Sequence, residues 1–269
     1  MATSRLLDSV VRALEILEVL DAEGELTNSK IAQRLGMEKS TVFRTLNTLR
    51  AKNFVRQDPE TLKYSNSYKL FEMGHNVARR TGLPKQAFRF MRKLANTVNG
   101  AINLGVLDGD KVVYIDKIES DETVKVCMKI GQGIPLYCTG LGKSFLASMS
   151  HQAIKAIIGP GPYKSYTEKT ITTFDQLALD LEETRKRGYS IDDEEHFRGI
   201  VCVAAPIYNA KGETIASLSV AVIKMYNGQS EIDFKFLGQA VYEAADGLTG
   251  SVGGQRPNHF LPWASGQGA

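Results

Sequence analysis

Residues 27–46 read TNSKIAQRLGMEKSTVFRTL, and this stretch decides the fold of the N-terminal part of the chain. Ala32, Gly36 and Val42 fall four and then six residues apart within it. A small alanine lets two helices cross closely, a glycine accepts the positive φ of a tight turn, and the valine docks the second helix on the first. This spacing is typical of a helix-turn-helix, whose second helix reads DNA in the major groove.

The helix after this turn, expected over residues 38–52, has an apolar side and a polar side. Val42, Leu46 and Leu49 project to the apolar side. The other side carries short hydroxyls, an arginine and an asparagine, which are residue types that contact phosphates, guanine and adenine. The alternative is an ordinary solvent-facing polar surface. The DNA contacts predicted on this helix are Lys39, Ser40, Thr41, Phe43, Arg44 and Asn47.

Two short strand-like runs, residues 54–56 and 62–64, flank the sequence Asp58-Pro59-Glu60-Thr61. Aspartate in the first position and proline in the second suit a type I turn. A hairpin that directly follows a recognition helix is the wing of a winged helix-turn-helix. Arg56 and Lys63 are the predicted phosphate contacts of this wing.

Charge is concentrated in the same region. The 269 residues contain 33 Lys+Arg and 30 Asp+Glu, a formal charge of only +3. Residues 27–56, however, carry seven basic groups and one acidic group, whereas residues 1–26 carry two basic and six acidic groups. A local excess of this size predicts a phosphate-binding surface, with a solvated basic helix face as the alternative.

The first helix, expected over residues 8–22, is apolar nearly all round. A surface helix needs only one apolar stripe, so its second face must pack on something. A partner subunit and burial within the same domain are the two alternatives. The chain is divided into a winged helix-turn-helix over 6–67, a linker helix over 68–83, a further domain over 84–250 and a disordered tail over 251–269.

The further domain is predicted to be α+β with an antiparallel sheet. Strand runs flank Asp108-Gly109-Asp110, a strong hairpin signal, and a third run at residues 124–130 continues the sheet. Strands return at 200–208 and 215–222, and helices separate these groups. Strands that come in hairpin-linked groups argue against a doubly wound parallel sheet.

Enzymatic, metal and membrane signals are weak. Gly140 to Ser144 looks like the end of a P-loop, but the earlier glycine that a P-loop requires is absent. A glycine-rich turn that opens a helix can instead bind a small carboxylate through its backbone amides, and a simple helix entry is the alternative. Asp192, Glu195 and His196 match no zinc spacing. No nucleophile elbow, cofactor motif, membrane span or signal peptide is evident, and three cysteines are too few for a disulfide framework. We therefore expect a cytoplasmic, non-enzymatic protein without a cofactor or metal.

Six further runs stand out along the chain: SVVRALEIL (9–17), IAQRLG (31–36), KSTVFRTL (39–46), GIPLYCTGLGK (133–143), GYSIDDEEH (188–196) and GIVCVAAP (199–206). In these runs, and from about Leu6 to Gly250, the chain resembles the IclR family of bacterial transcriptional regulators. The resemblance implies a winged helix-turn-helix, a C-terminal effector domain related to the GAF fold, and homodimers or tetramers on palindromic operator DNA. Two further runs, YSNSYKLFEMG (64–74) and VYIDKIES (113–120), look most like the KdgR-type repressors of 2-keto-3-deoxygluconate catabolism.

The resemblance also implies a pocket for a small organic acid. The backbone amides of Gly140 and Leu141 are expected to hold its carboxylate, and the side chains of Asp192, Cys202 and Ser219 to contact the rest. We expect a DNA-binding regulator, a repressor in sign, that responds to an acid such as a 2-keto sugar acid. A small-molecule enzyme and a nonspecific DNA-organising protein are the alternatives.

Overall fold

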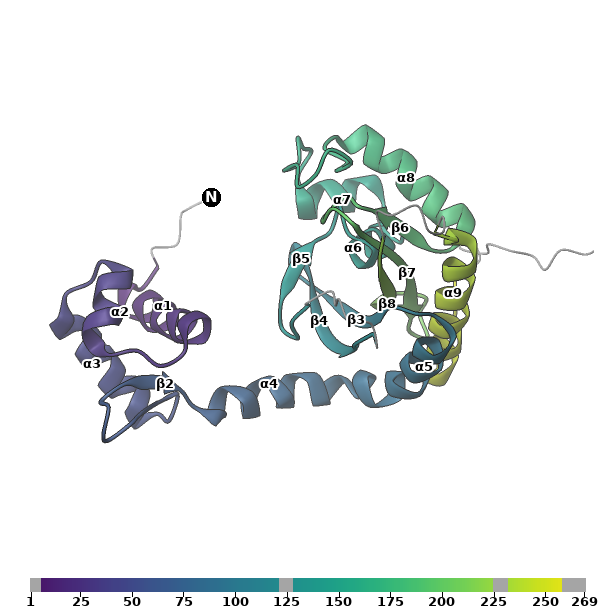
Figure 1. Ribbon diagram of the computed structural model, residues 1–269. Coiled ribbons are helices and arrows are strands. Elements are labelled where there is room, and N and C mark those ends of the chain that lie inside the picture. Colours follow the sequence, from purple (N-terminus) through teal and green to yellow (C-terminus); the bar gives the residue numbers. More distant parts are fainter. Residues whose placement is uncertain (1–5, 121–127, 225–231, 258–269) are drawn as a thin grey trace, which may run out of the picture. The chain divides into compact units, whose positions relative to one another are not determined.

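The computed structural model describes residues 6–120, 128–224 and 232–257. The chain folds as two compact units that divide between Thr81 and Gly82 (Figure 1). Each unit has its own apolar core, so each is described by itself.

The N-terminal unit consists of three helices, a two-stranded sheet and a fourth helix. Thr27 caps α2 by accepting a hydrogen bond from the Lys30 amide, and Gly36 ends this helix with φ 62°. The core contains Ile16, Ile31 and Val42, one residue from each of the first three helices. The bounds are α1 Asp8–Glu23, α2 Asn28–Leu35, α3 Lys39–Ala51, β1 Val55–Gln57, β2 Tyr64–Asn66 and α4 Tyr68–Thr81.

The C-terminal unit is built on a six-stranded antiparallel sheet with the order β5-β4-β3-β8-β7-β6. Its strands are β3 Ala101–Asp108, β4 Lys111–Ile118, β5 Gly133–Pro135, β6 Ser190–Asp193, β7 Ile200–Tyr208 and β8 Thr214–Ile223. Its helices are α5 Leu83–Thr97, α6 Gly140–Leu146, α7 His151–Ile158, α8 Phe174–Arg187 and α9 Phe234–Ser251. The predicted α+β class and the antiparallel sheet are confirmed.

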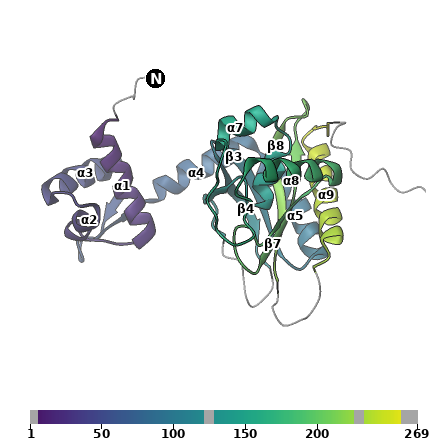
Figure 2. The same ribbon diagram turned by 90° about the horizontal axis from the view of Figure 1, so that it is seen from above.

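The sheet separates two helical layers (Figures 1 and 2). Helices α5 and α9 form one core with residues such as Ile102 and Leu104, whereas α6, α7 and α8 form the other. Because side chains alternate along a strand, Asn103 faces the α6 side of the sheet. Strands β3 and β8 are adjacent, and Asn103 lies directly opposite Ser219. This pairing creates a buried polar patch beneath α6.

Two sequence predictions concern the run at residues 124–130 and the tail that begins at residue 251. The run predicted as a strand at 124–130 lies mostly outside the described residues, and residues 128–130 are not in a strand. The tail predicted to be disordered from residue 251 begins as ordered chain: Ser251 ends α9, and the amides of Gly254 and Gln255 donate to the carbonyls of Thr249 and Asn209. The side chain of Arg256 contacts Tyr208 and Tyr242, so cation–π contacts stabilise this stretch. Residues 258–269 lie outside the described ranges.

Candidate functional site

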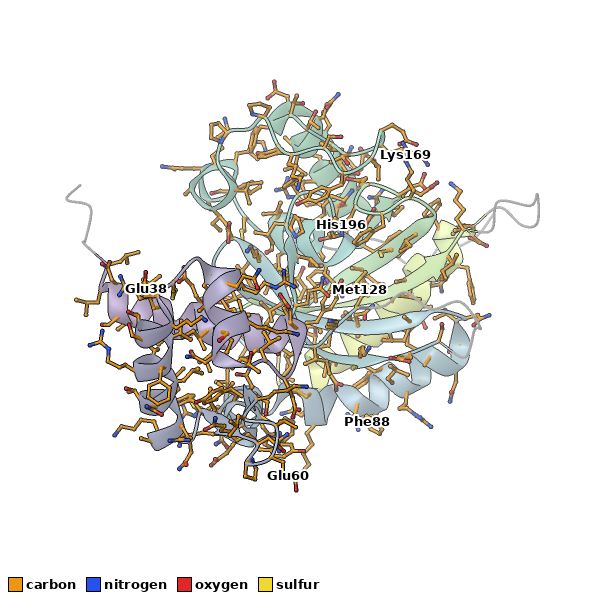
Figure 3. All side chains as sticks on the ribbon, turned by 60° about the vertical axis from the view of Figure 1, so that its left-hand side comes forward. Glu38, Glu60, Phe88, Met128, Lys169 and His196 are labelled. Carbon is orange, nitrogen blue, oxygen red and sulfur yellow. The ribbon has the colours of Figure 1, made fainter. Side chains whose placement is uncertain are left out.

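The polar side of α3 is the first candidate surface. Val42, Leu46 and Leu49 are buried, as the helical projection predicts. The opposite side is solvent-facing in this unit, with Lys39, Ser40, Phe43 and Arg44 exposed and with Thr41 and Asn47 half-buried. Figure 3 labels Glu38, the residue that precedes α3, and Glu60, which lies in the turn between β1 and β2. The helix thus presents its hydroxyl, guanidinium and ammonium groups to solvent.

Arg50 is a residue on this surface that the sequence reasoning missed. Its guanidinium donates to the Gln57 carboxamide at 2.7 Å and to Asn47 Oδ1 at 3.3 Å. It therefore fixes the orientation of the asparagine predicted to contact DNA and links α3 to the first strand of the wing. Its position three residues after Asn47, on the same helical face, is a signal that could have identified it.

A groove between α1 and α3 borders the same surface. Thr41 and Arg44 line it together with Val10 and Leu14, and its volume is about 590 Å³. Val10 and Leu14 remain 51% and 54% exposed, so the second apolar face of α1 is not covered by the described part of its own unit. Of the two alternatives for this face, burial within the domain is not what the structure has.

The wing is a short hairpin held by side-chain hydrogen bonds. Arg56 Nε donates to Ser65 Oγ of the opposite strand at 2.9 Å, and Lys63 is exposed. The turn is longer than the predicted type I turn, because the Leu62 amide donates to the Asp58 carbonyl across five residues. Hydrogen bonds from Thr61 hold the pKa of Asp58 below its usual range. A carboxylate that keeps its charge stabilises this turn.

The second candidate site is a small cavity under α6 in the C-terminal unit. Gly140, Leu141, Asp192, Cys202 and Ser219 all line it, so the structure brings the five predicted effector residues together. Its volume of about 10 Å³ has room for roughly one water molecule. An organic acid can enter only if lining side chains move.

The start of α6 forms one wall of the cavity. Thr139 caps this helix by accepting from the Gly142 amide, and the described structure gives the amides of Gly140 and Leu141 no acceptor. Glycine is required here by close packing: a Cβ on Gly140 would lie 3.3 Å from the Cβ of Cys202, and one on Gly142 only 2.2 Å from the Leu136 carbonyl oxygen. The site therefore offers two unpaired N–H donors at a fixed position.

Asp192 and Cys202 face each other across paired strands β6 and β7. Burial and, to a lesser extent, the nearby charge of Glu195 raise the pKa of Asp192 to about 7, although the Glu195 amide donates to Asp192 Oδ1 at 2.7 Å. Burial also raises the pKa of the Cys202 thiol well above its ordinary value. The thiol is thus protonated at neutral pH, and the carboxyl is partly protonated. At neutral pH the cavity therefore carries less negative charge than an ionised thiol and carboxylate would give it.

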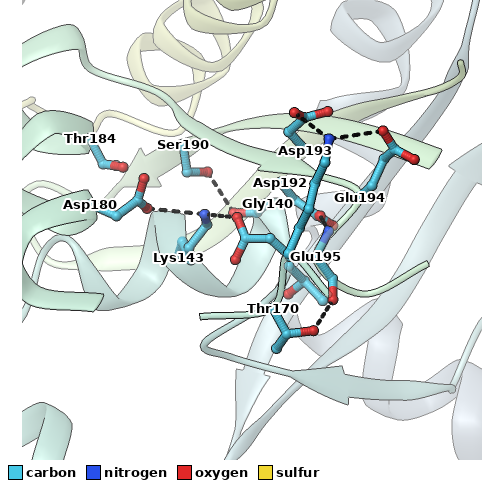
Figure 4. Close-up of polar contacts among 12 residues, drawn as sticks. Gly140, Lys143, Thr170, Asp180, Thr184, Ser190, Asp192, Asp193, Glu194 and Glu195 are labelled. Atoms are coloured by element: carbon cyan, nitrogen blue, oxygen red, sulfur yellow. Dashed lines mark hydrogen bonds and ion pairs between the residues drawn. The ribbon is translucent and has the colours of Figure 1, made fainter. Parts of the chain in front are cut away.

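A buried ion-pair network supports the wall (Figure 4). Lys143, on α6, is fully buried and contacts Glu195 and, at 3.0 Å, Asp180 of α8. The carbonyl of Glu195 accepts from Thr170 Oγ1 at 2.6 Å, and Ser190 Oγ donates to the Gly140 carbonyl at 2.6 Å. The network ties α6, α8 and the turn after β6 into one assembly.

The turn after β6 covers the cavity. His196 and Phe197 both line it, and Figure 3 labels His196 and Met128 among the lining residues. The His196 ring lies edge-on to Tyr166 at 4.8 Å, and Thr167 Oγ1 donates to the Glu194 carbonyl at 2.7 Å. The segment around residues 166–170 therefore holds this cover down.

The sequence reasoning missed several residues of the cavity, Asn103, Tyr114 and Phe197 among them. Asn103 and Tyr114 lie in apolar strand runs, and only the pairing of strands shows which face they occupy. The described residues, Asp192, Glu195 and His196 among them, contain no cluster arranged to hold a metal. None of the described helices is both long and apolar enough to cross a bilayer.

The two surfaces define a DNA-binding regulator with a separate ligand domain. Family models for the IclR helix-turn-helix domain and for the bacterial transcriptional regulator IclR C-terminal domain match residues 9–59 and 75–249. The chain belongs to the IclR family of transcriptional regulators. The alternative of a small-molecule enzyme is therefore wrong.

Individual relatives cover most of the chain. The HTH-type transcriptional regulator KdgR of Escherichia coli is 38% identical over 79% of this chain and 81% of its own length. The transcriptional repressor IclR of Escherichia coli is 30% identical over 92% of this chain and 91% of its own length. The crystal structure of Thermotoga maritima IclR superposes with a TM-score of 0.77 at 29% identity, over 91% of this chain and 99% of that one.

Proposed function

We propose that this regulator is a repressor that binds a palindromic operator as a homodimer or tetramer and is controlled by a small organic acid such as a 2-keto sugar acid. The observation that carries the proposal is the cavity under α6, where two unpaired amides and a partly protonated carboxyl meet. The repressive sign is supported by the relative from Escherichia coli that is a transcriptional repressor, IclR.

DNA recognition is assigned to α3 and the wing. Arg44 and Asn47 suit guanine and adenine in the major groove, and Lys39 and Ser40 suit the flanking phosphates. Arg56 and Lys63 on the wing contact the backbone beside the groove. The exposure of most of this set and the +6 charge of residues 27–56 support the assignment.

A dimer is supported by uncovered apolar side chains on two helices of the N-terminal unit. Val10 and Leu14 are half-exposed on α1, and Phe71 and Val77 are 72% and 67% exposed on α4. Burial of such groups against a second copy is favourable at roughly 25 cal/mol per Å². A two-fold pair of recognition helices would read two half-sites one helical turn apart, which requires an inverted repeat.

The carboxylate of the acid is assigned to the amides of Gly140 and Leu141. The side chains of Asp192, Cys202 and Ser219 contact the rest of the molecule. A partly protonated Asp192 can donate a hydrogen bond to an anion that an ionised aspartate would repel. The acid controls DNA binding if it favours one arrangement of the chain over another, transmitted through the α4–α5 segment.

Selection of DNA from a random pool by the purified protein tests the operator proposal. We expect enrichment of an inverted repeat, with binding that Arg44→Ala weakens. Uniform retention of all sequences would support the nonspecific DNA-organising alternative and contradict the proposal. A thermal-shift screen of 2-keto and aromatic acids tests the effector, because a ligand that binds only the folded state raises the melting temperature.

A further inference from the structure

Asn103 occupies the middle of the polar patch beneath α6. It is 2% exposed, lines the cavity, and lies directly opposite Ser219 on the neighbouring strand. Its neighbours in β3, Ile102 and Leu104, face the other helical layer. The side chain therefore reaches the space that the effector is proposed to occupy.

The carboxamide oxygen of Asn103 has no hydrogen-bond partner among the described residues. Its Nδ2 donates to the Ala101 carbonyl at 3.4 Å, which orients the amide. Ser217, two residues from Ser219 on the same face, is satisfied in contrast: its hydroxyl donates to Ser144 Oγ at 2.9 Å. Buried acceptors are nearly always paired, so an unpaired one beside a cavity indicates a missing donor.

The chemistry of the lining selects which donor can fill this position. None of the described residues that line the cavity is a lysine or an arginine. Nearby Lys143 is directed to Glu195 and Asp180. A second carboxylate would therefore face Asn103 and Asp192 without a balancing cation. A hydroxyl supplies the donor without adding a charge.

We propose that Asn103 is a specificity-determining residue that selects a hydroxylated acid: its carboxamide oxygen accepts a hydrogen bond from a hydroxyl on the chain of the effector. The inference rests on the proposed effector site and names the class of acid it takes, a hydroxylated monocarboxylate. Dicarboxylates and acids with a plain alkyl chain are the molecules that this contact discriminates against.

Calorimetric titration of the full chain with two acids of equal carbon number tests this selection. 2-Keto-3-deoxygluconate carries hydroxyls, and 2-oxohexanoate has the same six-carbon 2-keto acid skeleton without them. We expect the wild type to prefer the hydroxylated acid, and Asn103→Leu to reduce that preference by about tenfold, since one neutral hydrogen bond is lost. Asn103→Asp retains an acceptor, so it should weaken both acids but keep their ratio. Ser217→Ala, on the same sheet face with a satisfied hydroxyl, is the matched control.

The ratio of the two affinities distinguishes a failure of the role of Asn103 from a failure of the proposed effector site. Equal affinity of the wild type for both acids, or an unchanged ratio in Asn103→Leu, overturns the role of Asn103 while leaving the effector site standing. Binding of neither acid overturns the proposed 2-keto acid effector, and the inference falls with it. If Asn103→Leu does not fold, the ratio in Asn103→Asp decides: a lost preference overturns the proposal.

Discussion

Replacement of Lys143 by methionine is the most informative perturbation of the C-terminal unit. The two side chains have similar volume, so the change removes a charge from a site where the lysine is fully buried, with little change in packing. Two carboxylates lose a partner, those of Glu195 and Asp180. The two carboxylates differ in the partners and the solvent exposure that remain to them once the lysine is removed.

The structure assigns most of the cost to Glu195. Asp180 is partly exposed and keeps an ion pair with Arg187 at 3.6 Å, so water and a second cation compensate it. The Glu195 side chain is buried, and burial already raises its pKa in spite of Lys143. An uncompensated buried charge costs about 3–5 kcal/mol. For a unit of this size that corresponds to a fall in melting temperature of roughly 6–20 °C.

Thermal unfolding of wild type and variants at two pH values tests this reasoning. Without Lys143 the folded pKa of Glu195 rises further, so protonation relieves the charge and the penalty should be smaller at about pH 5 than at about pH 8. Adding Glu195→Gln to Lys143→Met should recover part of the loss. Lys186→Met, which breaks only an exposed pair with Glu183, should leave the melting temperature nearly unchanged, because an exposed ion pair contributes little to stability. A Lys143→Met penalty no larger than this control at pH 8 would refute the account.

Further outcomes follow from the same structure. Arg44→Ala should weaken operator binding by about 1–3 kcal/mol and relax the base preference, as measured by anisotropy titrations. Arg56→Ala should weaken binding to all DNA sequences alike and lower the slope of the salt dependence by about one. Identical behaviour of the two variants would contradict the assignment of Arg44 to bases and Arg56 to phosphates. Protonation of Asp192 stabilises the fold by up to about 4 kcal/mol. This contribution is fully present below about pH 3.8 and is lost as the pH rises through about 7. Asp192→Asn should flatten that dependence in melting curves, and an equally steep Asn variant would argue against it. Gly142→Ala should lose about 1–3 kcal/mol in urea unfolding, because the added Cβ meets backbone, while Gly250→Ala in open space should lose none; equal stability would contradict the close packing.

Local features of the fold were predictable because they depend on neighbouring residues. The spacing of Ala32, Gly36 and Val42 predicted the helix-turn-helix, and Gly36 has the expected positive φ. Asp108 and Lys111 pair across the predicted hairpin. The turn of the wing was less predictable, since Leu62 takes φ 55° and lengthens it.

The candidate cavity depends on contacts that sequence spacing does not reveal. The residues predicted for it came from family resemblance, whereas Asn103 was found only through the pairing of β3 with β8, far apart in the chain. The ion pair between Lys143 and Glu195 spans 52 residues. Such residues are set by tertiary pairing, which no local pattern encodes.

The central claim is that an acid in the cavity under α6 controls DNA binding by α3. Its most direct test is an anisotropy titration of the selected inverted repeat with the full chain, in the absence and in the presence of saturating 2-keto-3-deoxygluconate. Coupling of the usual size predicts that the acid weakens operator binding by about 5- to 150-fold. Unchanged operator affinity at an acid concentration that calorimetry shows to be saturating would contradict the claim.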